Sequence, residues 1–69
     1  MAIIIKHTHS ASVEIHFMGK DGFVFRQRMI DTMDNLTEHV CDMFNEHNFT
    51  YADVCDASTG EVLMQLERA

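Results

Sequence analysis

Two stretches of alternating apolar and polar residues, separated by a short glycine-bounded segment, constrain the fold of this chain more than any other feature. The alternation runs over residues 12–18 and again over residues 23–29. A period of two places the apolar side chains on one face of a β-strand. Residues 19–22, which begin and end with glycine, are typical of a hairpin turn. The first half of the chain therefore predicts a β-hairpin.

The apolar residues also predict the register of this hairpin. A two-residue turn would place Phe17 opposite Arg26. A three-residue loop that ends with a left-handed Gly22 instead places Phe17 opposite Phe25, and His16 opposite Arg26. Because a slip of one residue would move a whole apolar set to the wrong face, we predict the three-residue loop.

A helix is predicted to follow the hairpin. Asp31 begins a segment typical of a helix N-terminus, a side-chain cap followed by an acidic residue in the first turn. Apolar residues then recur at helical spacing and form one stripe: Met33, Leu36, Val40, Met43 and Phe44. Asn48 is expected to end the helix in the left-handed conformation.

Two further strands are expected over residues 51–56 and 61–66, and residues 3–6 predict either an edge strand or the start of a longer first strand. The inward residues of the last strand would be Val62, Met64 and Leu66. The fold class is therefore α+β: a small single domain over residues 1–69, ordered (β)ββαββ, with one helix on a four- to five-stranded, mainly antiparallel sheet. The helix would cover one sheet face and leave the other open, with His16, Met18, Val24, Leu63 and Tyr51 or Cys55 on it.

The composition fits one compact domain in a reducing compartment. The 69 residues have an ordinary apolar share, enough for a single core. Two cysteines are too few for a disulfide scaffold, and the apolar start is interrupted by Lys6 too early for a signal peptide. We therefore expect a cytoplasmic protein without a membrane span.

The charge is distributed unevenly. Residues 1–28 carry four basic and two acidic residues, whereas residues 29–69 carry nine acidic residues against Arg68 alone. Such asymmetry indicates an electrostatic interaction surface. An acidic domain without a basic stripe lacks the charges that neutralise phosphates, so we expect no direct nucleic-acid binding and no membrane partner.

Four acidic residues lie on one predicted helix face and are the candidate partner-binding residues: Asp34, Glu38, Asp42 and Glu46. Each successive pair places like charges four residues apart, which costs roughly 0.2–0.5 kcal/mol per pair. The face has two interpretations. It either keeps the domain soluble or docks on the basic surface of a partner protein, such as one that normally holds nucleic acid.

Metal binding and catalysis find less support. His7 and His9 could place two imidazoles on one strand face, but no third ligand is identified and no zinc-site spacing occurs. We therefore predict no metal and no cofactor. Cys41 is expected to lie buried beside the apolar stripe, and Cys55 follows no nucleophile turn. With neither an activated thiol nor a phosphate-binding glycine loop, an enzyme is not predicted.

The leading hypothesis is a small binding or inhibitor module that docks its acidic helix on a basic partner. No motif identifies a family, but in size and charge the chain resembles the small acidic proteins that phages and mobile elements encode to block host proteins, anti-CRISPR proteins among them. One alternative is a homo-oligomeric accessory subunit that pairs, for example as a homodimer, through the open sheet face or the residue 3–5 edge. The other alternative is a metal-binding regulator.

Overall fold

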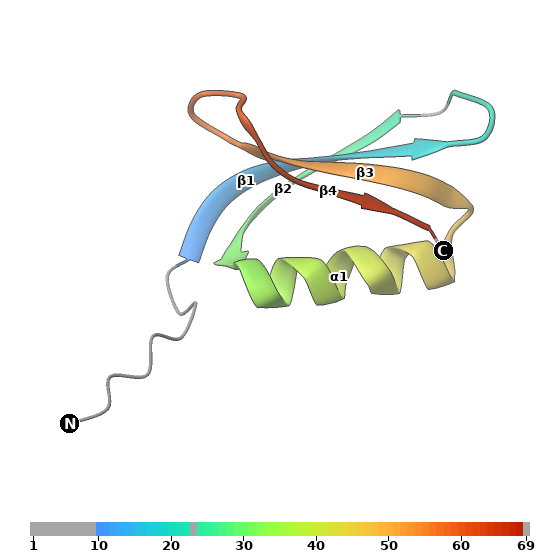
Figure 1. Cartoon of the computed structure of the whole chain (residues 1–69), viewed down its shortest axis with the longest axis horizontal. Coiled ribbons are helices and arrows are strands. Elements are labelled where there is room, and N and C mark those ends of the chain that lie inside the picture. Colours follow the sequence, from blue (N-terminus) through green and yellow to red (C-terminus); the bar gives the residue numbers. More distant parts are fainter. Residues whose placement is uncertain (1–9, 23, 69) are drawn as a thin grey trace.

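One helix lies against one face of a four-stranded antiparallel sheet in the computed structural model, which describes residues 10–22 and 24–68 (Figure 1). In chain order the elements are β1 (Ser10–Gly19), β2 (Val24–Thr32), α1 (Met33–Glu46), β3 (Phe49–Asp56) and β4 (Val62–Glu67). The strand order in the sheet is β2-β1-β3-β4. The α+β class and the ββαββ order predicted from the sequence are confirmed. The proposed strand over residues 3–6 lies outside the described residues.

The predicted register of the first hairpin is confirmed. Phe17 lies opposite Phe25, and His16 lies opposite Arg26. The backbone N–H of Gly22 donates to the carbonyl of Gly19 at 3.2 Å, and Gly22 has a φ of 76°. This left-handed conformation is one that only glycine adopts without strain, and it lets a three-residue loop reverse the chain.

The helix begins where the sequence predicts, but it ends differently. The Thr32 side chain is the N-cap and accepts a hydrogen bond from the backbone N–H of Asn35 at 3.2 Å. Asp31 supports this turn, since its carboxylate accepts from the Asn35 side chain and from the Thr32 N–H, each at 2.8 Å. At the other end the C-cap is His47, in extended conformation with a φ of −133°. The left-handed stop predicted at Asn48 is wrong, because no described non-glycine residue has a positive φ.

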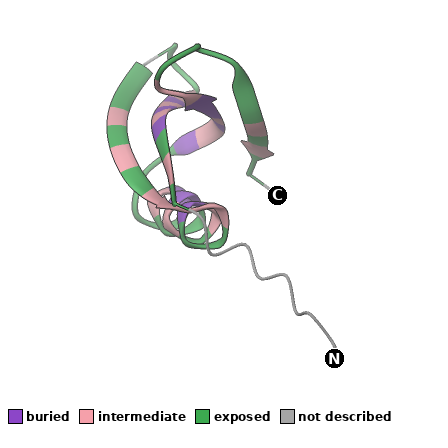
Figure 2. Cartoon of the chain, turned by 90° about the vertical axis from the view of Figure 1, so that its left-hand side faces the viewer, coloured by how far each residue is buried: buried purple, intermediate pink, exposed green. Residues whose placement is uncertain are grey.

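The core lies between the helix and the concave face of the sheet. Figure 2 shows that the buried residues gather where the helix faces the two central strands. The cluster comprises Val13, Ile15, Phe17, Leu36, Val40, Phe44, Phe49, Ala52 and Val54. The Phe17 ring stacks on Phe49 at 5.0 Å and contacts Phe25 at 6.0 Å between ring centroids. Aromatic burial therefore supplies much of the stabilisation at one end of the domain.

The second hairpin departs from the prediction at one residue. Met64 and Leu66 pack against the core as expected, but Val62 is 46% exposed. The sheet register shifts between Val54 and Cys55. An irregularity of this kind changes the face to which the following side chains point, so the simple alternation read from the sequence does not extend to Val62.

Candidate functional site

The outer surface of α1 carries the four acidic residues predicted to bind a partner, here called the acidic stripe: Asp34, Glu38, Asp42 and Glu46. All four are exposed. They lie opposite the buried helix residues Leu36, Val40 and Phe44. At 3.6 residues per turn, spacings of four rotate successive acidic residues by only about 40°. The stripe therefore runs along the whole helix on the side that faces away from the sheet.

No cation of the described residues neutralises the stripe. Within residues 10–22 and 24–68, the two ion pairs both involve Glu14, which contacts His16 at 2.7 Å and Arg28 at 3.1 Å. Arg26 and Arg28 alternate on β2 with the residues that face the core, so they lie on the open side of the sheet, away from the helix. No ion pair among the described residues therefore offsets the negative charge of the stripe.

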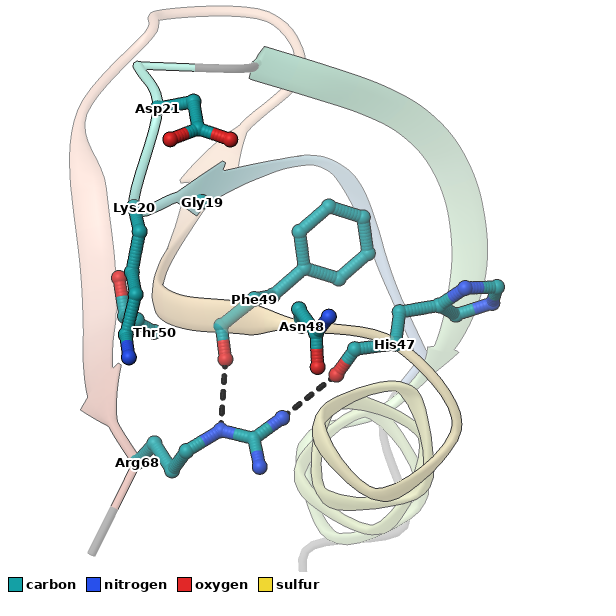
Figure 3. Close-up of a pocket in the computed structure, with 8 residues that line it drawn as sticks. All are labelled: Gly19, Lys20, Asp21, His47, Asn48, Phe49, Thr50 and Arg68. Carbon is teal, nitrogen blue, oxygen red and sulfur yellow. Dashed lines mark hydrogen bonds between the residues drawn. The ribbon is translucent and has the colours of Figure 1, made fainter.

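The negative end of the helix is stabilised from outside the helix. The last turn of α1 contains no basic residue, yet carbonyl groups at a helix C-terminus favour a nearby cation. Arg68, which follows β4, fills this role (Figure 3). Its guanidinium donates to the carbonyl oxygens of Phe44, of His47 at 2.5 Å and of Phe49 at 2.8 Å.

The same region contains a pocket of about 530 Å³. Its lining residues are Gly19, Lys20, Asp21, His47, Asn48, Phe49, Thr50 and Arg68 (Figure 3). Arg68 is directed at backbone carbonyls, and Lys20 shares the pocket with the opposite charge of Asp21. The arrangement stabilises the helix end. The positive charges of Arg68 and Lys20, which would otherwise recognise an anion, are partly compensated.

The open face of the sheet carries a polar network. Glu14 accepts hydrogen bonds from His16 and Arg28, and these contacts, His16 first, hold the pKa of the Glu14 carboxyl below its usual value. On β3, the hydrogen-bonded Asp53 carboxylate raises the pKa of the Tyr51 phenol. These groups lie on a strand surface without a described cleft, and the arrangement identifies no substrate site.

The two cysteines have different environments. Cys41 is exposed on the helix, so the prediction of a buried thiol there is wrong. The position lies one residue before Asp42, on the edge of the apolar stripe that turns toward solvent. Cys55 is buried, and burial raises the pKa of its thiol. Cys41 therefore lies within the exposed helix surface, beside the acidic stripe.

The metal hypothesis gains no site from the described residues. In residues 10–22 and 24–68, no three His, Cys, Asp or Glu side chains are grouped as a metal site would require. His16 bonds to Glu14, and the Nε2 atom of His39 lies 2.8 Å from the side-chain oxygen of Gln27. His7 and His9, the pair singled out from the sequence, lie outside the described residues.

Arg68 is the residue of this region that the sequence did not reveal. A signal was present: the acidic half of the chain contains one basic residue, and the helix ends without a cation of its own. A helix C-terminus favours a cation, so the lone arginine was a candidate for that position. Only the fold shows that the end of β4 returns to the helix end.

Comparison with known proteins does not extend these findings, because no family model, no curated protein and no solved structure matches the chain. Among the helices of the described residues, none has both the length and the apolar character needed to cross a bilayer.

Proposed function

We propose that this protein is a small binding module that docks its acidic stripe on a basic surface of a partner protein. The observation that supports the proposal is the uncompensated charge of the stripe. Its four carboxylates are exposed and form no ion pair within residues 10–22 and 24–68. Like charges four residues apart destabilise a helix, and a basic partner would relieve this repulsion.

The helix geometry defines the partner surface. A rise of 1.5 Å per residue separates successive carboxylates of the stripe by about 6 Å, and Asp34 from Glu46 by about 18 Å. The partner should therefore present Lys or Arg residues along a track of about that length. Such charge complementarity mainly accelerates association and selects the partner, and it weakens as salt rises.

Docking of this kind would make the protein an inhibitor if the basic surface normally holds nucleic acid. The stripe would then compete for the same cations that contact phosphates. The competition has a direct consequence: the partner should release its nucleic acid when the protein binds, with a stoichiometry of one module per basic track.

The test compares two variants of equal net charge. The Glu38→Lys/Asp42→Lys variant reverses the centre of the stripe, whereas Asp21→Lys/Glu61→Lys makes the same charge change at exposed turn positions outside the stripe. A partner is captured from the native lysate at low salt, purified and titrated with each variant. We expect the stripe variant to bind at least about tenfold more weakly and the control to bind nearly as the parent does.

A cross-linker attached to Cys41 provides a second measurement. Because Cys41 lies beside the stripe and Cys55 is buried, a photoreactive maleimide should label the helix alone and cross-link to a basic segment of the partner. A control carries the same probe at Ser58→Cys with Cys41→Ser, in the exposed turn between β3 and β4. Equal affinities of the two charge variants, or cross-links from position 58 alone, would refute docking through the stripe.

A further inference from the structure

The two edge strands of the sheet carry the exposed apolar side chains of the described residues. Val24, Phe25 and Ile30 lie on β2, and Val62 and Leu63 lie on β4. Ile30 is the most exposed of them, at 74%. Edge strands also present backbone N–H and C=O groups without a neighbouring strand, which makes them templates for pairing with another chain.

The direction of the backbone groups of β4 follows from its pairing with β3. The N–H of Arg68 donates to the carbonyl of Thr50 at 2.9 Å. Bonding direction alternates along a regular antiparallel strand, so Met64 and Leu66 also bond to β3, whereas Gln65 and Glu67 direct their N–H and C=O groups away from the sheet. The alternation ends at the irregularity that follows the Val54–Met64 pair, since the backbone N–H of Asp56 donates to the carbonyl of Glu61.

The backbone groups of β2 also alternate in direction. The N–H of Ala57 donates to the carbonyl of Ser12 at 3.0 Å, so the even-numbered residues of β1 bond to β3 and the odd-numbered ones to β2. Since Val13 lies opposite Met29, odd-numbered residues of β2 bond to β1. The even-numbered ones direct their backbone groups outward: Val24, Arg26, Arg28 and Ile30.

The two edges are complementary in direction. All neighbouring strands in the order β2-β1-β3-β4 are antiparallel, so β2 and β4 run in opposite directions. A second copy that continues the twist of the sheet would therefore pair its β2 antiparallel to β4 and extend the sheet.

One register matches the side chains. With Gln65 opposite Arg28 of a second copy, Glu67 lies opposite Arg26. Acid then meets base, and both pairs join outward-directed backbone groups. A shift by two residues places Glu67 opposite Val24, or opposite Arg28, which already contacts Glu14. Arg26 forms no ion pair within residues 10–22 and 24–68, so it is available to Glu67.

Pairing of identical edges is less favourable. If β2 paired with β2 of another copy, the register that aligns Val24 with Ile30 would place Arg26 opposite Arg28. If β4 paired with β4, Glu67 would have no basic residue opposite it. Like charges directly opposite each other are destabilising. The two edges therefore complement each other rather than themselves.

We propose that a second copy of this chain pairs its β2 with β4 in the register Gln65–Arg28 and Glu67–Arg26. The contact is heterologous, so it leaves one free edge of each kind and forms chains of copies or a closed ring. It does not depend on the acidic stripe.

Charge exchange tests this pairing in the full chain. Glu67→Arg and Arg26→Glu each place like charges across the contact, so each variant alone should associate about tenfold more weakly than the parent. An equimolar mixture of the two variants restores both contacts, and so does the double variant. Sedimentation velocity from micromolar to millimolar concentration measures the association, with circular dichroism to confirm that each variant is folded.

Disulfide trapping tests the register. Residues in a hydrogen-bonded antiparallel pair have Cα atoms about 5.5 Å apart, within the range that a disulfide spans. In a Cys41→Ser background, Gln65→Cys/Arg28→Cys should form a ladder of linked copies under mild oxidation, whereas Gln65→Cys/Val24→Cys should not. A parent that stays monomeric throughout, or a mixture of charge variants that fails to regain association, would overturn the pairing and leave the helix proposal unaffected.

Discussion

Replacement of Arg68 by methionine removes the only described cation that contacts the end of the helix. The guanidinium donates to three carbonyl oxygens, two at the end of α1 and one at the start of β3. It also lies 5.9 Å from the centroid of the Phe44 ring. Methionine keeps much of the aliphatic length that packs against this ring, so the substitution mainly removes the charge and the donors.

The contacts set the size of the effect. A cation at a helix C-terminus stabilises by about 0.3–1 kcal/mol when exposed and by up to about 2 kcal/mol when partly buried. Each hydrogen bond to a charged group adds further stabilisation. In the variant, however, water can reach these carbonyl oxygens and replace part of the lost hydrogen bonding. We expect Arg68→Met to lower the free energy of unfolding by about 1.5–2 kcal/mol. In a domain whose total free energy of unfolding is roughly 3.5–10 kcal/mol, this loss corresponds to a melting temperature about 10 °C lower.

Urea unfolding at constant pH, followed by circular dichroism, measures this difference. Arg68→Lys is the matched control, because it keeps the charge but loses the planar fork, and it should recover about half of the stability. Molar salt should reduce the difference between the parent and Arg68→Met, because it screens the attraction to the helix end. A loss below about 0.3 kcal/mol for Arg68→Met would show that water satisfies these carbonyls as well as arginine does, and would contradict a stabilising role of Arg68.

Three further predictions concern charge, pH and thiol chemistry. Asp42→Lys replaces two repulsive helix pairs by attractive ones and should raise the free energy of unfolding by about 1 kcal/mol at low salt in urea titrations; no gain would contradict the repulsion in the stripe. The contacts of Glu14 with His16 and Arg28 lower the pKa of its carboxyl. The stabilisation from these contacts is therefore complete above the unfolded pKa near 4.5, and it is lost as pH falls through the lower folded pKa. Glu14→Gln should therefore weaken the dependence of stability on pH in this acidic range, and an unchanged slope would contradict the prediction. Native protein should react with one equivalent of a maleimide at Cys41 and unfolded protein with two, because Cys55 is buried; two rapid equivalents in the native state would contradict this burial.

The sequence predicts the fold well where one physical requirement dominates. Phe17 opposite Phe25 follows from the need to keep one apolar face together, and Gly22 provides the turn that this register requires. The exposed position of the acidic stripe likewise follows from helical periodicity, because the apolar residues determine which side is buried.

Other features depend on contacts between distant segments. The exposure of Val62 results from an irregular pairing of β3 with β4, which alternation along one strand cannot reveal. Asn48 was a reasonable left-handed residue by local preference, but the chain enters β3 at once and His47 ends the helix in extended conformation. Arg68 reaches the helix end only because β4 is the edge strand beside β3.

The strand order has a consequence for the time at which the acidic stripe can be presented. β1 pairs with β2 across a three-residue loop, but it also pairs with β3, which joins Ile15 to Val54 with the whole helix between them. Contacts of such sequence separation form slowly, since a long loop must close first. Until β3 docks, only β1 and β2 of the sheet are in place to cover the apolar side of the helix. During synthesis, which proceeds from the N-terminus, the proposed docking surface would therefore lie on a packed helix only after β3 has left the ribosome.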